Sequence, residues 1–499
     1  MSHFTGTAAV LALTMSLCAP VLAEAPPPNA KAAEQQSQTR GLPPEAVTSH
    51  AIALQGEKIA FTARAGAIRL KDAKTEAPQA DVAYVSYERS GIEASGRPVV
   101  FIFNGGPGAA SAWLGLGAIS PWRLRFPPET PSPSLTPVLL DNAETWLAFG
   151  DLVFIDPPGT GYSKFLSEKD DVEKRFFSVD GDAEALAVVI RKWLTARGRL
   201  TSPKYIVGES YGGFRAVKLL APLRERENIG VDGLFLVSPA LDFTWLQGGR
   251  PPLSYAALLP SLAAVARNAR DRGQLADVEA YAAADYVVDL LKGPKDPQAQ
   301  SRMSEAVARF TALDRNFVAR LGARVDAKSF SRERKRNEQR IVSAYDGGVE
   351  GYDPDPFAPG GDWADPVLDA WRAPLGAAMT LLTQEKLAWP IGDARYAILD
   401  GRIARHWDFG HGGRANAEAL SDMRDALALD PRLKIVVLQG VADLVIPYFA
   451  TRLILDQLPA YGDADRVRLV VTAGGHMPYL RDEGRARMRD EARKLIERH

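Results

Sequence analysis

The stretch Tyr205-Ile206-Val207-Gly208-Glu209-Ser210-Tyr211-Gly212-Gly213 decides the fold of this chain. It joins a short apolar run of β type to a helical pattern over residues 214–224. A strand-to-helix turn this sharp leaves no room for side chains at its flanking positions, which explains Gly208 and Gly212. Such a turn strains the backbone of its serine and points the hydroxyl into an open cleft. The stretch therefore predicts a nucleophilic Ser210 at the carboxyl end of a strand.

Runs of the same β type recur along the chain and alternate with helical patterns such as residues 182–196. This alternation predicts an α/β fold, with a mostly parallel sheet covered by helices on both faces. Shorter alternating runs near the beginning, at residues 52–54, 58–63, 67–70 and 83–87, predict an antiparallel edge. The other predicted strands of the parallel part are residues 98–103, 152–155, 234–237, 434–438 and 468–471.

The stretch 243–390 interrupts this alternation. It is rich in Ala, Arg and Asp, has helical periods at 274–291 and 303–313, and holds a loop dense in Gly, Pro and Asp at 345–366. We interpret it as a mainly helical cap inserted between two parts of the core, residues 47–242 and 391–499; a separate domain is the competing interpretation.

The first 23 residues carry no Lys, Arg, Asp or Glu and end in Val21-Leu22-Ala23, which is typical of a secretory signal peptide. An uncleaved membrane anchor is the alternative, but the apolar run is shorter than the ~20 residues that a span needs. Residues 24–46, rich in Ala, Pro and Gln at their start, are expected to form a flexible leader. The only cysteine, Cys18, lies within the signal, so the mature protein would have no disulfide and no thiolate nucleophile. Together these features predict an exported bacterial protein, periplasmic or secreted.

The overall composition is that of an ordinary globular protein, with 46% hydrophobic residues, 24% charged residues and a net charge of −1. No basic stripe or acidic tail stands out, which argues against nucleic acid as a partner.

A serine nucleophile needs a base and an acid that orients the base, and in folds of this kind they follow the serine in the order acid, then histidine. Of the six histidines, two precede Ser210, one is the last residue, and His406 and His411 precede the last two predicted strands. His476 remains, in a glycine-rich loop directly after the strand that ends at Val471. Asp443, five residues after the predicted strand end at Leu438 and followed by apolar residues, is the predicted acid.

The glycine-rich loop Asn104-Gly105-Gly106-Pro107-Gly108 is expected to supply backbone N–H groups for the oxyanion, together with the N–H of Tyr211. A phosphate cradle is the alternative, but the loop lacks the Lys-Ser/Thr ending of a P-loop. The pair His406 and His411 beside Asp408 could indicate a metal, but the spacing is unusual for ligands, so no metal is predicted. We expect Trp407 and Phe409 to form apolar packing or a cleft wall.

Four blocks occur in an order that resembles the serine carboxypeptidase family. They are residues 104–108, the run Asp156-Pro157-Pro158-Gly159-Thr160-Gly161-Tyr162-Ser163, residues 208–213, and the pair formed by Gly440-x-x-Asp443 and Gly475-His476-Met477. The resemblance implies an α/β-hydrolase fold, no cofactor, and a peptide substrate with a free C-terminus. The site residues that it implies are a triad of Ser210, Asp443 and His476, an oxyanion hole of Gly106 and Tyr211, and substrate contacts from Asn104, Gly105 and Glu209.

The sequence departs from the family in the part that would hold the substrate's terminal carboxylate. Family members carry a second Glu fourteen positions after the Asn, and Ala118 stands there in this chain. Without it, Glu209 is expected to be ionised at neutral pH and to repel a carboxylate. The resemblance predicts a serine-type carboxypeptidase; an esterase or acyltransferase on the same scaffold is the second hypothesis. A catalytically inactive binding protein is the third, although Ser210, Asp443 and His476 are all present.

Overall fold

The computed structural model describes residues 41–54, 56–127, 131–167, 170–246 and 251–497. A mixed sheet runs through the molecule in the order β1-β2-β3-β7-β4-β9-β10-β13-β14, and the short strand β8 pairs with β3. The strands are β1 (Ala46–Leu54), β2 (Glu57–Lys71), β3 (Pro78–Arg89), β4 (Val99–Phe103), β7 (Asp151–Ile155), β8 (Lys164–Phe165), β9 (Lys204–Glu209), β10 (Gly233–Val237), β13 (Lys434–Gly440) and β14 (Val467–Thr472).

The sheet is antiparallel at its first edge and parallel elsewhere. β1, β2, β3 and β7 pair antiparallel in turn, and all pairings from β7 to β14 are parallel. The six strands of the parallel part are short apolar runs because helices cover both of their faces. The predicted fold class, α/β-hydrolase with a mostly parallel sheet, is confirmed.

Two local predictions were wrong in their boundaries. The runs 58–63 and 67–70 belong to one continuous strand, β2, whose ladder to β3 extends from Phe61 to Lys71. The predicted helix 214–224 is two helices, α5 (Tyr211–Lys218) and α6 (Leu220–Glu225). Pro222 lies in the first turn of α6 and has no N–H to donate to the preceding turn, so the hydrogen bonds of a single helix cannot continue through it.

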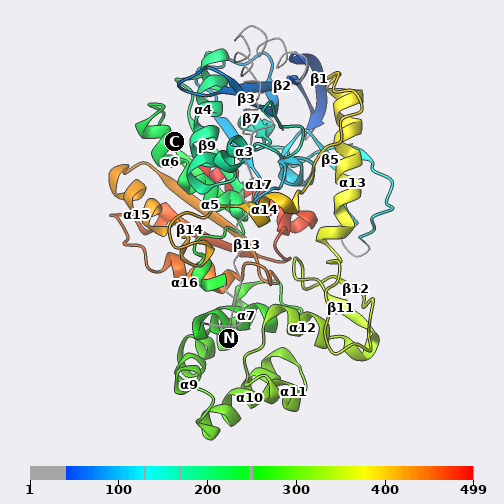
Figure 1. Cartoon of the computed structure of the whole chain (residues 1–499), viewed down its shortest axis with the longest axis vertical. Helices are drawn as coiled ribbons and strands as arrows, with labels where there is room; N and C mark the ends of the chain where they lie inside the picture. The colour runs from blue at the N-terminus through cyan, green and yellow to red at the C-terminus, as the bar shows by residue number, and fades with distance from the viewer. Residues whose placement is uncertain (1–40, 55, 128–130, 168–169, 247–250, 498–499) are drawn as a thin grey trace, which may run out of the picture.

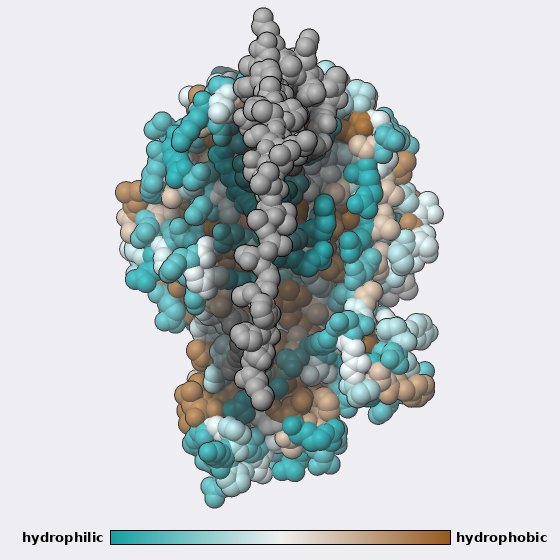
Figure 2. Space-filling model, viewed as in Figure 1, coloured by the Kyte–Doolittle hydropathy of each residue, from teal (hydrophilic) through white to brown (hydrophobic). Residues whose placement is uncertain are grey.

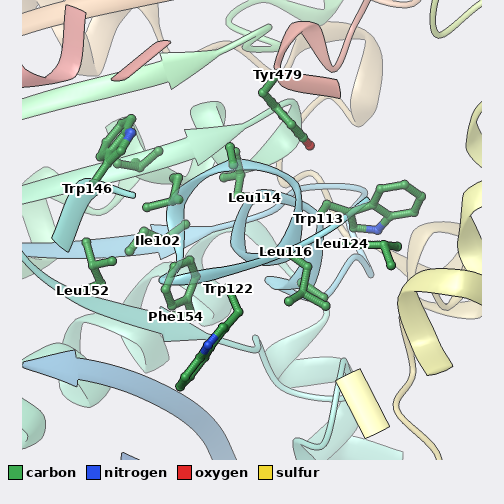
Figure 3. Packing of buried hydrophobic residues seen from close by; sticks show 14 of the residues in the cluster. Ile102, Trp113, Leu114, Leu116, Trp122, Leu124, Trp146, Leu152, Phe154 and Tyr479 are labelled. Carbon is green, nitrogen blue, oxygen red and sulfur yellow. The ribbon is translucent and has the colours of Figure 1, made fainter. Parts of the chain in front are cut away.

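Side chains that alternate along the strands enter two separate apolar layers. One layer packs against α4 (Val179–Ala196), α5, α6 and α15 (Leu420–Leu429). The other packs against α17 (Asp482–Glu497), α13 (Leu368–Leu381) and the helical turns α2 (Ala112–Leu114) and η1 (Gly115–Ile119). Figure 3 shows this second layer, in which Ile102, Leu152 and Phe154 of the sheet face Leu114, Leu116 and Trp122. Loops at the carboxyl ends of the strands are thereby fixed from both sides.

The chain between β10 and β13 leaves the sheet and forms most of the lower part of the molecule in Figure 1. An apolar cluster of its own lies between its helices and reaches Tyr448 and Phe449 of α16 (Tyr448–Leu455). The predicted helical period 274–291 is broken into two helices separated by a wider turn, η5 (Ala282–Tyr286). The helices and strands of this stretch up to residue 381 include α7 (Pro252–Arg267), α8 (Ala276–Tyr281), α9 (Val287–Lys292), α10 (Pro297–Thr311), α11 (Arg315–Arg320), α12 (Ala327–Glu333), β11 (Arg340–Val342), β12 (Glu350–Tyr352) and α13, which packs on the sheet.

The surface of the molecule is largely polar in the view of Figure 2, with hydrophobic side chains gathered mainly toward its lower end. Val288 and Leu291 of α9 are among the exposed large apolar residues of that region. Within the described residues, no helix has both the length and the apolar character to cross a membrane. The predicted signal peptide 1–23, with Cys18, and the leader up to residue 40 lie outside the described residues. The proposed division at residues 242 and 390 stays a prediction.

Candidate active site

Ser210 lies between the end of β9 and the start of α5, in a backbone conformation that few residues other than glycine adopt. Its φ is 59° and its ψ is −123°, which costs on the order of 1–3 kcal/mol and persists only where the surroundings enforce it. Its N–H donates to the carbonyl of Val237 at 2.9 Å, and its own carbonyl accepts from the N–H of Ala240 at 3.1 Å. The neighbouring strand β10 and the chain that follows it therefore hold the strained turn in place.

The glycines on either side of Ser210 are required by contacts within the turn. A Cβ on Gly208 would lie 2.0 Å from the carbonyl oxygen of Gly212. A Cβ on Gly212 would lie 2.8 Å from the carbonyl oxygen of Phe103, at the end of the adjacent strand β4. The sequence pattern predicts no room for side chains at these positions, and the atoms that would clash are these two carbonyl oxygens.

The glycine-rich loop after β4 packs directly on this turn. A Cβ on Gly105 would come within 2.5 Å of the N atom of Tyr211, so the backbones of the loop and the turn are in close contact. Gly106 follows with a φ of 101°, a conformation that favours glycine. Because Tyr211 also begins α5, its N–H lies at the positive end of the helix dipole. The two predicted oxyanion donors, Gly106 and Tyr211, therefore come from adjoining segments.

Arg215 of α5 holds the glycine-rich loop after β4 through its backbone. Its Nη1 donates to the carbonyl of Asn104 at 2.5 Å, and its Nε donates to Asp182 Oδ2 of α4 at 2.5 Å. Both side chains of the ion pair are almost fully buried, at 1% and 3% exposure. In addition, Asn104 Oδ1 accepts from the N–H of Leu114 at 3.0 Å. These bonds orient the Asn104 amide so that its nitrogen is the group left for other partners.

Asp443 and His476 form a buried hydrogen-bonded pair. Asp443 lies in the turn after β13, and His476 lies in the loop after β14. His476 Nδ1 is 2.9 Å from Asp443 Oδ2, while Asp443 Oδ1 accepts from the N–H groups of Val445 and Ile446, each at 2.9 Å. With Nδ1 donating to the carboxylate, Nε2 is the nitrogen able to accept a proton.

The electrostatics of the pair favour a basic imidazole. Burial by itself lowers the pKa of His476, but the charge of Asp443, its hydrogen bond and the nearby Glu209 outweigh burial and raise the pKa above its usual value of 6.5. An imidazolium formed during a reaction would therefore be stabilised by Asp443.

A segment from the part of the chain beyond β11 holds both members of this pair. The carbonyl of Tyr345 accepts from the N–H of His476 at 2.6 Å, and the Tyr345 ring meets the imidazole edge-on with ring centres 5.3 Å apart. On the acid side, the N–H of Leu444 donates to the carbonyl of Ala344 at 3.0 Å. Gly347 closes the connection by donating to the carbonyl of Ala442 at 3.1 Å.

An ion pair secures the same segment. Arg481, shortly after His476, donates from Nε and Nη2 to Asp346 Oδ2 at 3.0 and 2.8 Å. We call residues 344–347 the clasp, because these residues bind the acid-bearing turn and the base-bearing loop to each other.

Glu209 places a buried carboxyl group next to Ser210 in the chain. Burial raises its pKa to about 7 from the usual 4.5, although the nearby His476 and hydrogen bonds from Tyr479 and Asn104 pull the pKa down. The Tyr479 hydroxyl donates to Glu209 Oε2 at 2.5 Å. Because Tyr479, three residues after His476, bonds to Glu209, the turn with Ser210 lies beside the loop that carries His476.

The structure thus brings the predicted residues to one place: Ser210, Tyr211 and Glu209 in one turn, Asn104, Gly105 and Gly106 in the loop packed on it, and Asp443 and His476 beside it. Sequence reasoning missed Tyr479, Arg215 and the clasp. Tyr479 follows His476 within the same loop region, but a lone Tyr there carries no motif. The clasp lies far away in the chain, in a loop notable only for its Gly, Pro and Asp content.

The second motif block has a structural part that the sequence did not specify. Asp156 Oδ1 accepts from the N–H and hydroxyl of Ser111, at 2.9 and 2.8 Å, and from the hydroxyl of Tyr396 at 2.8 Å. Ser163 links the carbonyl of Asp156 to the N–H of Ala83, at 2.6 and 2.7 Å. Asp156 therefore ties the loop after β7 to the loop after β4.

The segment with the two histidines contributes apolar packing against the serine turn. Trp407 is buried, and its ring lies edge-on to Tyr211 with centres 5.2 Å apart. His406 is the last residue of α14 (Gly401–His406). Among the described residues, no group of His, Cys, Asp and Glu is arranged to hold a metal ion.

Comparison with known proteins finds a family match for the first part of the core. Residues 57–234, which carry the glycine-rich loop, Asp156 and the serine turn, match the family model of the serine carboxypeptidases. The resemblance to the serine carboxypeptidases is confirmed. Relatives include the serine carboxypeptidase-like 51 protein of Arabidopsis thaliana, 29% identical over 35% of this chain and 35% of that protein. The retinoid-inducible serine carboxypeptidase of Rattus norvegicus is 28% identical over 33% of each chain.

A pheromone-processing carboxypeptidase of Aspergillus niger is 29% identical over 35% of this chain and 26% of its own length. The match thus spans about a third or less of these relatives' length. The family match and the serine carboxypeptidase relatives support a serine hydrolase.

Solved structures with similar outlines include an esterase from Thermogutta terrifontis, with a TM-score of 0.36 and 13% identity over 86% of this chain and 98% of the esterase. A homoserine O-acetyltransferase from Bacillus anthracis has a TM-score of 0.36 and 9% identity over 92% of this chain and 98% of the transferase. At TM-scores this low, the two likenesses support no conclusion about function.

Proposed function

We propose that the chain is a serine-type carboxypeptidase that releases C-terminal residues from peptides through an acyl-enzyme. The observation that carries this proposal is the buried Glu209 carboxyl group, with Asn104 beside it, immediately before Ser210. A carboxyl group at that place can receive the free end of a peptide whose last peptide bond then lies over the serine. The match of residues 57–234 to serine carboxypeptidases agrees with this reading.

In the proposed acylation step, His476 Nε2 takes the proton of the Ser210 hydroxyl as the oxygen attacks the last peptide carbonyl. Asp443 keeps the imidazole in the correct tautomer and stabilises its charged form. The N–H groups of Gly106 and Tyr211 bind the oxygen that becomes negative. His476 then gives its proton to the leaving amine, so the terminal residue departs and the rest of the peptide stays esterified to Ser210.

Water completes the cycle in the reverse sense. His476 takes a proton from the water that attacks the ester carbonyl, and it returns the proton to Ser210 Oγ as the shortened peptide leaves. The proposed cycle asks for no change in the strained backbone of Ser210, whose φ is 59°.

Recognition of the substrate's carboxylate depends on the protonation of Glu209. Only the protonated carboxyl can donate a hydrogen bond to a carboxylate, and its pKa of about 7 makes that form abundant in mildly acidic solution. Asn104 is proposed to donate from its amide nitrogen to the same carboxylate, because its oxygen is already bound to Leu114.

The test is peptide trimming by the purified protein and by Ser210→Ala. A peptide with a free carboxyl end should lose residues one at a time, and the same peptide with an amidated end should be trimmed far more slowly in mildly acid solution. A fluorophosphonate should label the intact protein and not Ser210→Ala. Internal cleavage, or no trimming by a protein that labels, would refute the carboxypeptidase proposal.

A second candidate function is an esterase or acyltransferase. The observation that favours it is that position 118 carries only a methyl group, so Glu209 has no second carboxyl from that position with which to share a proton. Rapid hydrolysis of a blocked ester, with no trimming of free peptides at any pH, would select this candidate.

Three further elements of the proposal rest on sequence alone. We propose that residues 1–23 direct export and are removed, that the mature protein works in the periplasm or outside the cell, and that residues 243–390 act as a cap. N-terminal sequencing of the protein from fractionated cells would test the first two.

A further inference from the structure

We propose that Tyr479 is a specificity-determining residue of the Glu209 subsite, where its hydroxyl holds the carboxyl group that receives the substrate's C-terminus. This inference rests on the proposed carboxypeptidase function and adds a residue that none of the sequence motifs contains. Tyr479 lies in the short helical turn η10 (Pro478–Leu480) directly after the His476 loop.

The Tyr479 side chain packs in the core with its hydroxyl directed at Glu209. The residue is fully buried, and its hydroxyl donates to Glu209 Oε2 at 2.5 Å. Its ring lies against η1, where a Cβ on Gly117 would come within 2.5 Å of the ring atom Cε2. Figure 3 shows Tyr479 entering this layer from a different part of the chain than Trp113 and Leu114, toward which its side chain extends.

The smallness of η1 and the size of Tyr479 are therefore complementary. Gly117 leaves room for the ring, and Ala118, the next residue in the chain, carries only a methyl group. A phenol from η10 thus occupies the space next to Glu209 that side chains of η1 leave open. A hydroxyl there is a donor at every ordinary pH, because burial and the nearby Glu209 raise the pKa of Tyr479 well above 10.

Glu209 is consequently held by neutral donors rather than by a positive side chain. The direct partners are the Tyr479 hydroxyl and the Asn104 amide, from η10 and from the loop after β4. The charged or titratable groups that face it from other elements are His476, Asp443 and, from the clasp, Tyr345.

Removing the phenol hydroxyl should keep Glu209 protonated to a higher pH, because a donor to the carboxylate favours its charged form. Binding of a free peptide carboxylate should then persist to higher pH. A blocked substrate, which has no carboxylate, should not respond.

The experiment compares the wild type with Tyr479→Phe on two substrates of the same acyl part. One is an N-acylated peptide with a free carboxyl end, and the other is the corresponding methyl ester. For each, kcat/KM is measured from about pH 5 to about pH 9. We expect the alkaline limb for the free-carboxyl peptide to move up by about one pH unit in Tyr479→Phe, since a hydrogen bond to a charged group is strong enough for that. The ester profile should keep its shape. An unmoved limb, or equal movement for both substrates, would overturn the proposal.

A matched control is Tyr286→Phe, which removes another buried tyrosine hydroxyl, bonded to the carbonyl of Ala323 at 2.6 Å in the inserted part. It should cost similar stability and leave both pH profiles in place. A second measurement needs no turnover: infrared titration of the Glu209 carboxyl, assigned by loss of the band in Glu209→Gln. Its midpoint should rise in Tyr479→Phe. If the wild type never trims peptides but this midpoint moves, the proposed function fails and the role of Tyr479 in holding Glu209 stands; an unmoved midpoint refutes that role.

Discussion

Replacing Glu209 by Gln should make the stability of the protein less dependent on pH. The folded protein binds the Glu209 proton more tightly than the unfolded chain does, with a pKa of about 7 against the usual 4.5. A raised pKa favours folding while the group is protonated in both states, and this advantage is lost as pH rises from about 4.5 to about 7. The gap of about two and a half pH units corresponds to about 3 kcal/mol.

The amide of Gln fits the same place, since its oxygen can accept from Asn104 and its nitrogen can donate to the Tyr479 oxygen. The free energy of unfolding of Glu209→Gln relative to wild type should therefore improve by about 3 kcal/mol between about pH 5 and about pH 9.

Denaturant unfolding at both pH values measures the difference, and groups common to the two proteins cancel. Glu225→Gln, a change at an exposed side chain on α6, should show a difference that is flat to within about 0.5 kcal/mol. A flat difference for Glu209→Gln would refute the reasoning that burial sets this carboxyl's pKa.

Three other outcomes follow from the contacts of the site. Asp443→Asn should lower kcat on a blocked ester by about 10⁴-fold with little change in KM, because the amide stabilises the wrong tautomer of His476; a loss below about tenfold would contradict the assigned role. Arg215→Met should reduce the free energy of unfolding by about 3–5 kcal/mol, since Asp182 is left buried without its partner, whereas Arg224→Met, at an exposed side chain, should change it by less than about 0.5 kcal/mol. The acid limb of ester hydrolysis should have its midpoint above pH 6.5, because the base is active only when neutral and the pKa of His476 is raised; a midpoint below that value would argue that burial outweighs Asp443.

The core of the fold could be predicted because local sequence patterns identify its strands. Short apolar runs that end in glycine-rich loops mark β4, β9 and β14, and the serine turn needs Gly208 and Gly212 for reasons confined to a few residues. The order of the strands in the sheet is not local. β7 lies between β3 and β4, although it follows both in the chain.

Partners distant in the chain escaped sequence reasoning for the same cause. Tyr345 contacts His476 across more than a hundred intervening residues. No local sequence pattern around either residue predicts this contact. The expectation that Glu209 would be ionised at neutral pH without a paired acid is not met in full, because burial raises its pKa to about 7.

The clasp bears on how such proteins can be recombined. Residues 344–347 supply hydrogen-bond acceptors to Leu444 and His476 and a donor to Ala442, so excising the stretch between β10 and β13 would leave backbone groups near Asp443 and His476 without partners. A chimera that takes this stretch from a homologue would pair the homologue's clasp with this chain's turn after β13 and loop after β14. The exchangeable unit is therefore the stretch together with the turn after β13 and the loop after β14, and libraries of hybrids cut at those seams should retain activity more often than libraries cut at the edges of the inserted helices.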